Sequence, residues 1–390
     1  MSISIITFAD LGRKKSLATA DILPVIDHFS KTGELTKVIC RANTNFHFKN
    51  TVQAVPTIIH YLIRAVEEIF NITFSSRLQR EEIFDFCAQY RLQKTKIVLF
   101  HDGRFLSRTL RKAQKNGSVM VDITRNGHMQ FNDDLEKEEL RLLGFPLYKG
   151  LFAEFARASQ HLNEFDYVIA ISDFVKRSYV AQGYPAERIF VANIDIDIKR
   201  FTPPTQQRSR EKTFQVLYVA YTKPHKGLHY LLDAWESLSL KNAELVLVGS
   251  YGEMPEELKQ RYKARIEQNP NIRWIGNISQ PEESYRKASV FVLPSLTEGN
   301  PKVVMEAMAC GLPVITTTNA QSIVEDGKTG FVVPIRDAKM LAEKIKYLYD
   351  RRDEAELMGK EARRVVEKKK PFDEAVYEIY KEILKKKHKK

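Results

Sequence analysis

Two carboxylates in residues 290–318 lie near one short turn, Glu298 at the mouth of the turn and Glu306 on the helix that follows it. The pattern predicts a buried strand, a turn that carries Glu298, and a helix that begins at Pro301 with Asn300 as its N-cap. Glu306 then lies about a turn and a half along that helix. The free backbone N–H groups of such a turn suit a diphosphate, because a helix N-terminus attracts negative charge.

The helix after this turn is expected to be amphipathic. Its apolar residues recur at spacings of three and four and form one face: Val303, Val304, Ala307 and Met308. Lys302 and Glu306 therefore point away from the core. Taken alone, two glutamates near a helix start are most often solvated surface residues, so the case for a site depends on the rest of the chain.

Strands and helices alternate along the whole chain, which predicts an α/β protein with parallel sheets built from βαβ units. At 390 residues the chain is long for one core, and the polar run at 203–213 divides it into two alternating halves. Residues 52–90 are interpreted as two helices, and a closing helix begins at Phe372. The expected strands lie at 3–8, 37–40, 96–100, 118–122, 215–221, 244–248, 272–275, 290–293, 314–317 and 330–333.

Further polar candidates follow the strands of the first half. His101 comes directly after the strand at 96–100, where a histidine is either a site residue or a packing residue. The loop after the first strand carries Gly12, Arg13 and two lysines, and it either contacts an anion or is a solvated turn. A third group lies at the end of the strand at 118–122 and consists of Asp122, Thr124, Arg125 and His128.

The motif that runs from Glu298-Gly-x-Pro to Glu306-Ala-Met-Ala-x-Gly-x-Pro-Val resembles the nucleotide-sugar signature of the retaining GT-B glycosyltransferases of family 4, the group 1 glycosyltransferases. The resemblance is strong over almost all of the second half and loose over the first. It implies a GT-B fold with two Rossmann-like, doubly wound parallel-sheet domains that face a central cleft. Residues 1–203 would form the acceptor side and 204–371 the donor side, with the last helix, about 372–390, crossing back to the first domain.

The resemblance also implies a site for a nucleotide sugar. Lys226, in the pair Lys226-Gly227, would hold the donor diphosphate, Glu306 the ribose hydroxyls, and Glu298 the donor sugar. The predicted catalytic residues are Lys226, Glu298 and His101. The predicted donor-binding residues are Gly12, Arg13, Lys223, Lys226, Gly249, Asn277, Ile278, Glu298, Gly299, Asn300, Pro301, Lys302, Val303 and Glu306.

Three departures from the family pattern concern the site. After the first strand of the second half, Ala220-Tyr221 replaces the usual Gly-Arg, so Lys223 or Arg13 is expected to share the phosphate charge. Thr124 stands where family members commonly place a histidine that faces the donor sugar. Ile194 replaces the glycine that usually follows the asparagine of the interdomain crossing.

The implied reaction moves a hexosyl unit from a nucleotide diphosphate sugar to a glycan or lipid-linked precursor with retention of configuration. No metal and no cofactor are expected, because side chains and a helix N-terminus neutralise the departing diphosphate, which itself accepts the proton of the acceptor. Three alternatives stay open: a sugar epimerase, a phosphorylase and a catalytically silent scaffold subunit.

The composition of the chain limits which partners and which cellular compartment are expected for this protein. The formal net charge of +12 favours an anionic partner, but no aromatic-interleaved basic motif indicates nucleic acid. The basic tail at 384–390 has two readings, contact with an anionic membrane or a solvated end. Three cysteines without metal-ligand spacing indicate free thiols, and no signal peptide or membrane span is recognised. We therefore expect a cytoplasmic protein, with contact to the cytoplasmic membrane face as an option.

Overall fold

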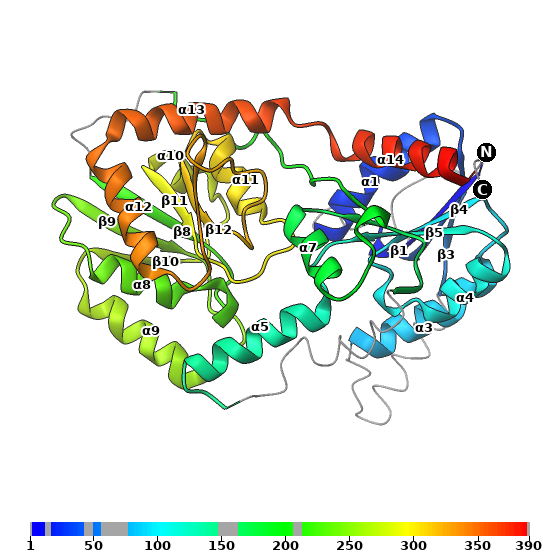
Figure 1. The fold of residues 1–390 in the computed structure, drawn as a ribbon, viewed down its shortest axis with the longest axis horizontal. Helices are drawn as coiled ribbons and strands as arrows, with labels where there is room; N and C mark the ends of the chain where they lie inside the picture. Colours follow the sequence, from blue (N-terminus) through cyan, green and yellow to red (C-terminus); the bar gives the residue numbers. More distant parts are fainter. Residues whose placement is uncertain are drawn as a thin grey trace.

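The computed structural model describes residues 2–11, 17–42, 50–55, 77–146, 163–205 and 213–387. Gly12 and Arg13, which we predicted to contact the donor, lie outside the described residues. Within the described part of the chain, two parallel sheets each carry helices on both faces (Figure 1). The predicted α/β class with two doubly wound domains is confirmed. We call the unit built on the seven-stranded sheet the first domain and the unit built on the six-stranded sheet the second domain.

The first sheet has the strand order β3-β2-β1-β4-β5-β6-β7. Its strands are β1 (Ile3–Asp10), β2 (Leu35–Ala42), β3 (Thr51–Gln53), β4 (Ile97–His101), β5 (Val119–Thr124), β6 (Tyr167–Ala170) and β7 (Ile189–Val191). The described α-helices of this domain are α1 (Leu17–Lys31), α3 (Arg77–Arg91), α4 (Ser107–Lys115), α5 (Met129–Leu142) and α7 (Asp173–Ala181). The central strands β4 and β5 are buried almost throughout and mostly apolar, because helices cover both faces of the sheet.

One assignment in this domain was wrong. We interpreted residues 52–90 as two helices, but Thr51–Gln53 forms the edge strand β3, which pairs in parallel with β2. Thr51 and Val52 are β-branched and favour a strand, and the hydrogen-bonding edge of β2 decides the outcome. The later part of the range does contain a helix, α3.

The second sheet has the strand order β10-β9-β8-β11-β12-β13 and agrees closely with the predicted strands. The strands are β8 (Phe214–Val219), β9 (Ala243–Val248), β10 (Ile272–Gly276), β11 (Val290–Leu293), β12 (Val314–Thr317) and β13 (Gly330–Val333). The helices are α8 (Leu228–Glu236), α9 (Glu256–Gln268), α10 (Glu282–Lys287), α11 (Lys302–Ala309), α12 (Ala338–Asp350) and α13 (Arg352–Lys368), with a 3₁₀ turn, η4 (Pro224–Lys226).

Each sheet has a topological switch point, where the chain changes the direction in which it adds strands. In the first sheet β1 lies between β2 and β4, and in the second sheet β8 lies between β9 and β11. Open α/β sheets bind ligands beyond the carboxyl ends of the strands at such points. The loops after β1, β4 and β5 in the first domain and after β8 and β11 in the second are therefore the places to look for a site.

Two helices, α5 and α14 (Phe372–Lys387), make contacts between the two domains (Figure 1). Helix α5 follows β5 of the first domain and runs from below α7 toward α9, and it packs against η4 of the second domain. At the other side the chain leaves α13 and returns as α14, which packs against α1. The apolar residues of α14 join the core of the first domain, which confirms the predicted crossing.

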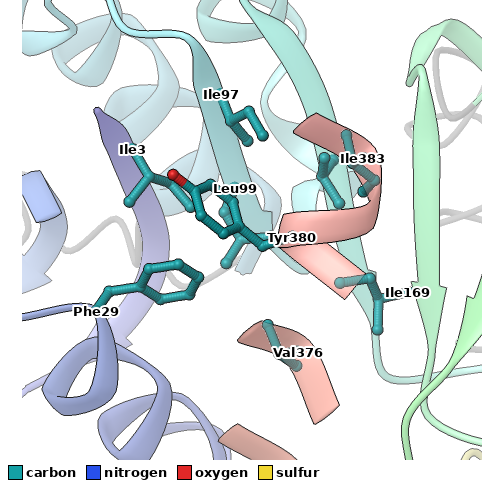
Figure 2. Close-up of a pocket in the computed structure, with 9 residues that line it drawn as sticks. Ile3, Phe29, Ile97, Leu99, Ile169, Val376, Tyr380 and Ile383 are labelled. Carbon is teal, nitrogen blue, oxygen red and sulfur yellow. The ribbon is translucent and has the colours of Figure 1, made fainter. Parts of the chain in front are cut away.

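A small apolar cavity lies under α14, between this helix and the first sheet (Figure 2). Its volume of about 10 Å³ is close to the room that one water molecule needs. It is lined by Ile3, Phe29, Ile97, Leu99, Val121, Ile169, Val376, Tyr380 and Ile383. Burial raises the pKa of the Tyr380 phenol, and its hydroxyl has no hydrogen-bond partner within the described part of the chain.

Replacing Tyr380 with phenylalanine is expected to raise the free energy of unfolding by about 1 kcal/mol, because a buried polar group without a partner is destabilising. Urea unfolding followed by circular dichroism measures this change. The matched control is Tyr184→Phe, which removes a buried hydroxyl that donates to the Phe165 carbonyl at 2.7 Å and should cost about 1 kcal/mol. Equal losses in both variants would show that the Tyr380 hydroxyl is satisfied.

No helix among the described residues is both long and apolar enough to cross a membrane.

Candidate functional site

Lys226 and Glu298, predicted from separate motifs, form an ion pair at the switch point of the second sheet. The Lys226 Nζ lies 2.5 Å from the Glu298 Oε1, and their side chains are only 20% and 12% exposed. Ser295 Oγ donates to the same carboxylate oxygen at 2.9 Å. The ammonium of Lys226 donates one hydrogen bond to Glu298 and has two further N–H groups. It can therefore also bind an anion.

The loop after β8 requires glycine to place Lys226. Pro224 opens the turn η4, and Gly227 closes it with φ at +69°. A Cβ on Gly227 would lie 2.1 Å from the carbonyl oxygen of Pro294, which follows β11. The absence of a side chain therefore lets the loops after β8 and β11 pack directly against each other.

Glu306 lies on α11 and is held by Tyr285 of α10. The Tyr285 hydroxyl donates to the Glu306 Oε2 at 2.9 Å. Burial raises the pKa of the Glu306 carboxyl, and the hydrogen bond from Tyr285 offsets only part of this effect. The carboxylate is thus oriented by a buried partner, as a residue that recognises hydroxyl groups would need to be.

The remaining donor-side candidates lie at the ends of β8, β9 and β10. Gly249 has φ at +123°, and a Cβ there would lie 1.9 Å from the Ala220 carbonyl oxygen. Lys223 is half-buried, with its Nζ 3.9 Å from the Glu253 carboxylate. Asn277 is exposed, whereas Ile278 packs partly against the core of the second domain.

The turn at 298–302 is inserted into the first domain. A Cβ on Gly299 would lie 1.9 Å from the Arg125 carbonyl oxygen, so only glycine permits this approach. Ser172, the N-cap of α7, accepts from the Val175 N–H at 3.2 Å, and its hydroxyl donates to the Gly299 carbonyl. The turn thus contacts the loops after β5 and β6.

Our assignment of Asn300 as the helix N-cap was wrong. The helix begins at Lys302 with Pro301 in the N-cap position, and no side chain caps it. The Asn300 amide instead donates to the Ile171 carbonyl at 2.6 Å and to the Asn193 side chain at 3.0 Å. The side-chain oxygen that would cap the helix instead accepts from the Ser322 hydroxyl at 2.7 Å, a contact that local sequence does not reveal.

Lys302 also reaches the first domain. Its Nζ lies 2.7 Å from the Asp21 Oδ1 on α1, and the other Asp21 oxygen accepts from the Arg125 guanidinium at 2.8 Å. Asp21 was not among the predicted site residues. It stands at an ordinary position in an amphipathic helix, and no local pattern marks it.

His101 lies at the carboxyl end of β4, opposite Thr7 of β1, and is buried. The Thr7 hydroxyl lies 3.0 Å from the His101 Nδ1. Burial, reinforced by the charge of Arg125, lowers the pKa of His101 to about 3. The imidazole is therefore neutral at physiological pH and can exchange hydrogen bonds without carrying charge.

The other polar residues near β5 have structural partners. Asp122 is buried and accepts from the Gly103 N–H at 2.8 Å. The Thr124 hydroxyl lies 2.9 Å from the Tyr179 hydroxyl. Burial lowers the pKa of His128, whose backbone N–H donates to Ser178. Of this group, Arg125 is the residue whose side chain bonds to Asp21, the carboxylate that also binds Lys302 of the second domain.

A buried carboxylate on α5 of the first domain forms hydrogen bonds to side chains of the second domain. Glu139 is fully buried, and its Oε1 accepts from His229 at 2.7 Å and from Tyr230 at 2.8 Å. Its Oε2 accepts from the Arg336 Nε at 2.8 Å. We did not predict this cluster, because its members come from elements far apart in the sequence.

Solved structures define the class of fold. HepE of Anabaena, in complex with UDP and glucose, superposes with a TM-score of 0.63 at 16% identity over 98% of this chain and 99% of that chain. The lipopolysaccharide outer core galactosyltransferase WaaB gives a TM-score of 0.67 at 18% identity over 98% of this chain and 100% of that chain. The fold of this chain is therefore GT-B, and at this identity the likeness establishes the fold alone.

Sequence comparison then shows which protein family the second half of the chain resembles. Residues 200–365 match the family model described as glycosyl transferases group 1. The capsular polysaccharide biosynthesis glycosyltransferase CapM of Staphylococcus aureus is 30% identical over 217 residues, which are 52% of this chain and 57% of that protein. The matches span about half the length of the curated relatives.

Proposed function

We propose that this protein is a glycosyltransferase that moves a hexosyl unit from a nucleotide diphosphate sugar to a glycan or lipid-linked precursor. One observation carries the proposal. The Lys226–Glu298 pair lies at the switch point of the second sheet, within the segment that matches the group 1 model. HepE, which shares the fold, binds UDP and glucose, and CapM acts in capsular polysaccharide biosynthesis.

The donor would lie along the carboxyl ends of β8, β9, β10 and β11. In this proposal Lys226 neutralises the diphosphate, together with backbone N–H groups at the start of α11. Glu306 accepts hydrogen bonds from the ribose hydroxyls, and Glu298 from the donor sugar. Lys223, whose pairing with Glu253 is long at 3.9 Å, is placed to supply the charge of the arginine that Tyr221 replaces.

We propose further that the configuration of the sugar is retained. The bond from the anomeric carbon to the diphosphate oxygen breaks, and the acceptor oxygen forms its bond on the same face. The acceptor proton passes to the departing diphosphate, so no side chain has to act as the base. His101, neutral because its pKa is about 3, would serve as a hydrogen-bonding residue.

The test is a binding and hydrolysis screen of the purified protein against UDP-, GDP- and ADP-sugars, each with and without EDTA. We expect saturable binding of one nucleotide class, unchanged by EDTA and weakened about tenfold or more in Lys226→Ala. The control is Lys259→Ala, which removes a partly exposed lysine that pairs with Glu256 on α9. Thermal unfolding of each variant checks that the fold is intact.

Two results would contradict the proposal. Loss of binding with EDTA would show that a metal takes part. Failure of every nucleotide sugar to bind would favour a catalytically silent scaffold subunit, the reading to which the Ala220-Tyr221 departure lends support.

A further inference from the structure

A cluster of charged side chains that does not include Lys226 lies at the switch point of the first sheet. Asp21 on α1 bonds to Arg125, which follows β5, and to Lys302, which comes from the second domain. The Asp21 side chain is 5% exposed, and each of the two cations is 21% exposed. The partly exposed groups of this cluster are therefore the cations, and the carboxylate lies behind them.

Arg125 and Lys302 each have N–H groups beyond the one that donates to Asp21. The guanidinium of Arg125 carries five N–H groups, and one hydrogen bond joins it to Asp21. Its Nε is buried and has no acceptor within the described ranges of the chain. The ammonium of Lys302 has three protons, of which Asp21 accepts one. An oxygen-rich anion would supply acceptors to these groups.

The charge of the cluster also favours an anion. Arg125 and Lys302 contribute two positive charges and Asp21 one negative charge, which leaves a surplus of one positive charge. His101 adds none, because burial keeps its imidazole neutral. Phosphate matches this arrangement, since it offers several acceptor oxygens and arginine binds it through two parallel bonds.

We propose that Arg125 and Lys302 bind a phosphate group of the acceptor substrate, with Asp21 as the positioning residue that holds both cations. The proposal rests on the proposed function and names the class of acceptor. In the proposed function the first domain would hold the acceptor, and Lys302 lies four residues beyond Glu298 on the same turn. The phosphate of the acceptor would thus lie beside the donor sugar, while Lys226 serves the diphosphate of the donor.

The first experiment measures phosphate binding apart from the donor site. Inorganic phosphate is titrated calorimetrically into the full-length Lys226→Ala protein. This variant lacks the lysine that is proposed to bind the diphosphate of the donor. We expect saturable binding that Arg125→Gln weakens about tenfold or more, the effect of losing a charge-assisted hydrogen bond. Arg111→Gln, which removes an exposed arginine from α4, should bind phosphate as the parent does.

Lys302→Gln removes the second cation and should weaken phosphate binding by a similar factor, so the test does not depend on the folding of one variant. Equal phosphate affinity in the parent, Arg125→Gln and Lys302→Gln would overturn the proposal, as would no binding to the parent. Failure of the proposed function has a different signature, because it appears as loss of nucleotide-sugar binding in the wild type.

The second experiment identifies the source of the phosphate. Initial rates are measured at saturating donor with a soluble sugar phosphate, with a sugar joined through a diphosphate to a short prenyl chain, and with the same sugar unphosphorylated. Arg125→Gln should raise KM about tenfold or more for the phosphorylated acceptor that the wild type prefers, with a smaller change in kcat. A similar KM increase for the unphosphorylated sugar would overturn the proposal.

Discussion

Replacing Glu306 with glutamine is expected to weaken nucleotide-sugar binding about a hundredfold while the protein stays folded. A carboxylate accepts hydrogen bonds from two ribose hydroxyls, and loss of about 3 kcal/mol from such charged bonds corresponds to that factor. The glutamine carbonyl can still accept from Tyr285, which now donates to Glu306 at 2.9 Å. Calorimetric titration with the nucleotide sugar identified by the donor screen gives the affinity.

The pH dependence of binding provides a second readout for Glu306. Burial raises the pKa of this carboxyl above its ordinary value. Because the ionised form accepts hydrogen bonds from both ribose hydroxyls, donor affinity should be full above the raised pKa and fall as the pH drops through it. The glutamine variant should lack this dependence. Wild-type affinity in the variant at every pH would remove Glu306 from the donor site.

Tyr285→Phe is the matched control for this experiment. It removes the hydrogen bond that orients Glu306 and leaves the carboxylate in place. We expect a smaller loss of affinity than in Glu306→Gln. An equal loss in both variants would show that Glu306 acts through the packing of α10 against α11 and has no contact with the donor.

Replacing Glu139 with alanine is expected to lower the free energy of unfolding by about 3–5 kcal/mol, because the change leaves buried partners without their common acceptor. His229, Tyr230 and Arg336 all donate to this carboxylate across the domain boundary. The loss should also uncouple the two domains, so that denaturant unfolding separates into two transitions. Urea titration followed by circular dichroism and by tryptophan fluorescence detects both effects.

The stability that Glu139 contributes should depend on pH. Burial by itself raises a carboxyl pKa, but the hydrogen bonds from His229 and Arg336 outweigh it and hold the pKa of Glu139 below its ordinary value. A carboxyl whose folded pKa is depressed stabilises the fold above its unfolded pKa, about 4.3, and loses this effect as the pH falls through the folded value. The wild type should therefore lose more stability in acid than Glu139→Gln does.

Glu138→Ala is the control for the Glu139→Ala experiment. Glu138 is the neighbour of Glu139 on α5 and also pairs with Arg336, at 2.9 Å, but its side chain is 55% exposed. Exposed ion pairs contribute about 0–1 kcal/mol, so this variant should unfold almost as the wild type does. Similar losses in the two variants would show that burial of Glu139 does not set its contribution.

The alternation of apolar runs and turn residues predicted most of the fold. All six strands of the second sheet lie within a residue or two of their predicted positions, because each is a buried run bounded by polar loops. The last helix was predicted from its apolar face, and that face is what packs on the first domain. The edge strand at Thr51–Gln53 was missed, since a three-residue strand carries too little periodicity to be distinguished from a helix.

The sequence by itself determined the residues that a single loop and its helix bring together. Glu298 and Glu306 belong to one continuous motif, and a strand followed by a turn and a helix fixes their spacing. The tertiary structure decided which partners these residues and their neighbours meet. Asp21 and Lys302 are 281 residues apart, and Glu139 and Arg336 are 197 apart, yet each pair forms a hydrogen-bonded ion pair. Periodicity records how one element is buried, whereas a contact between domains depends on how two folded surfaces fit together.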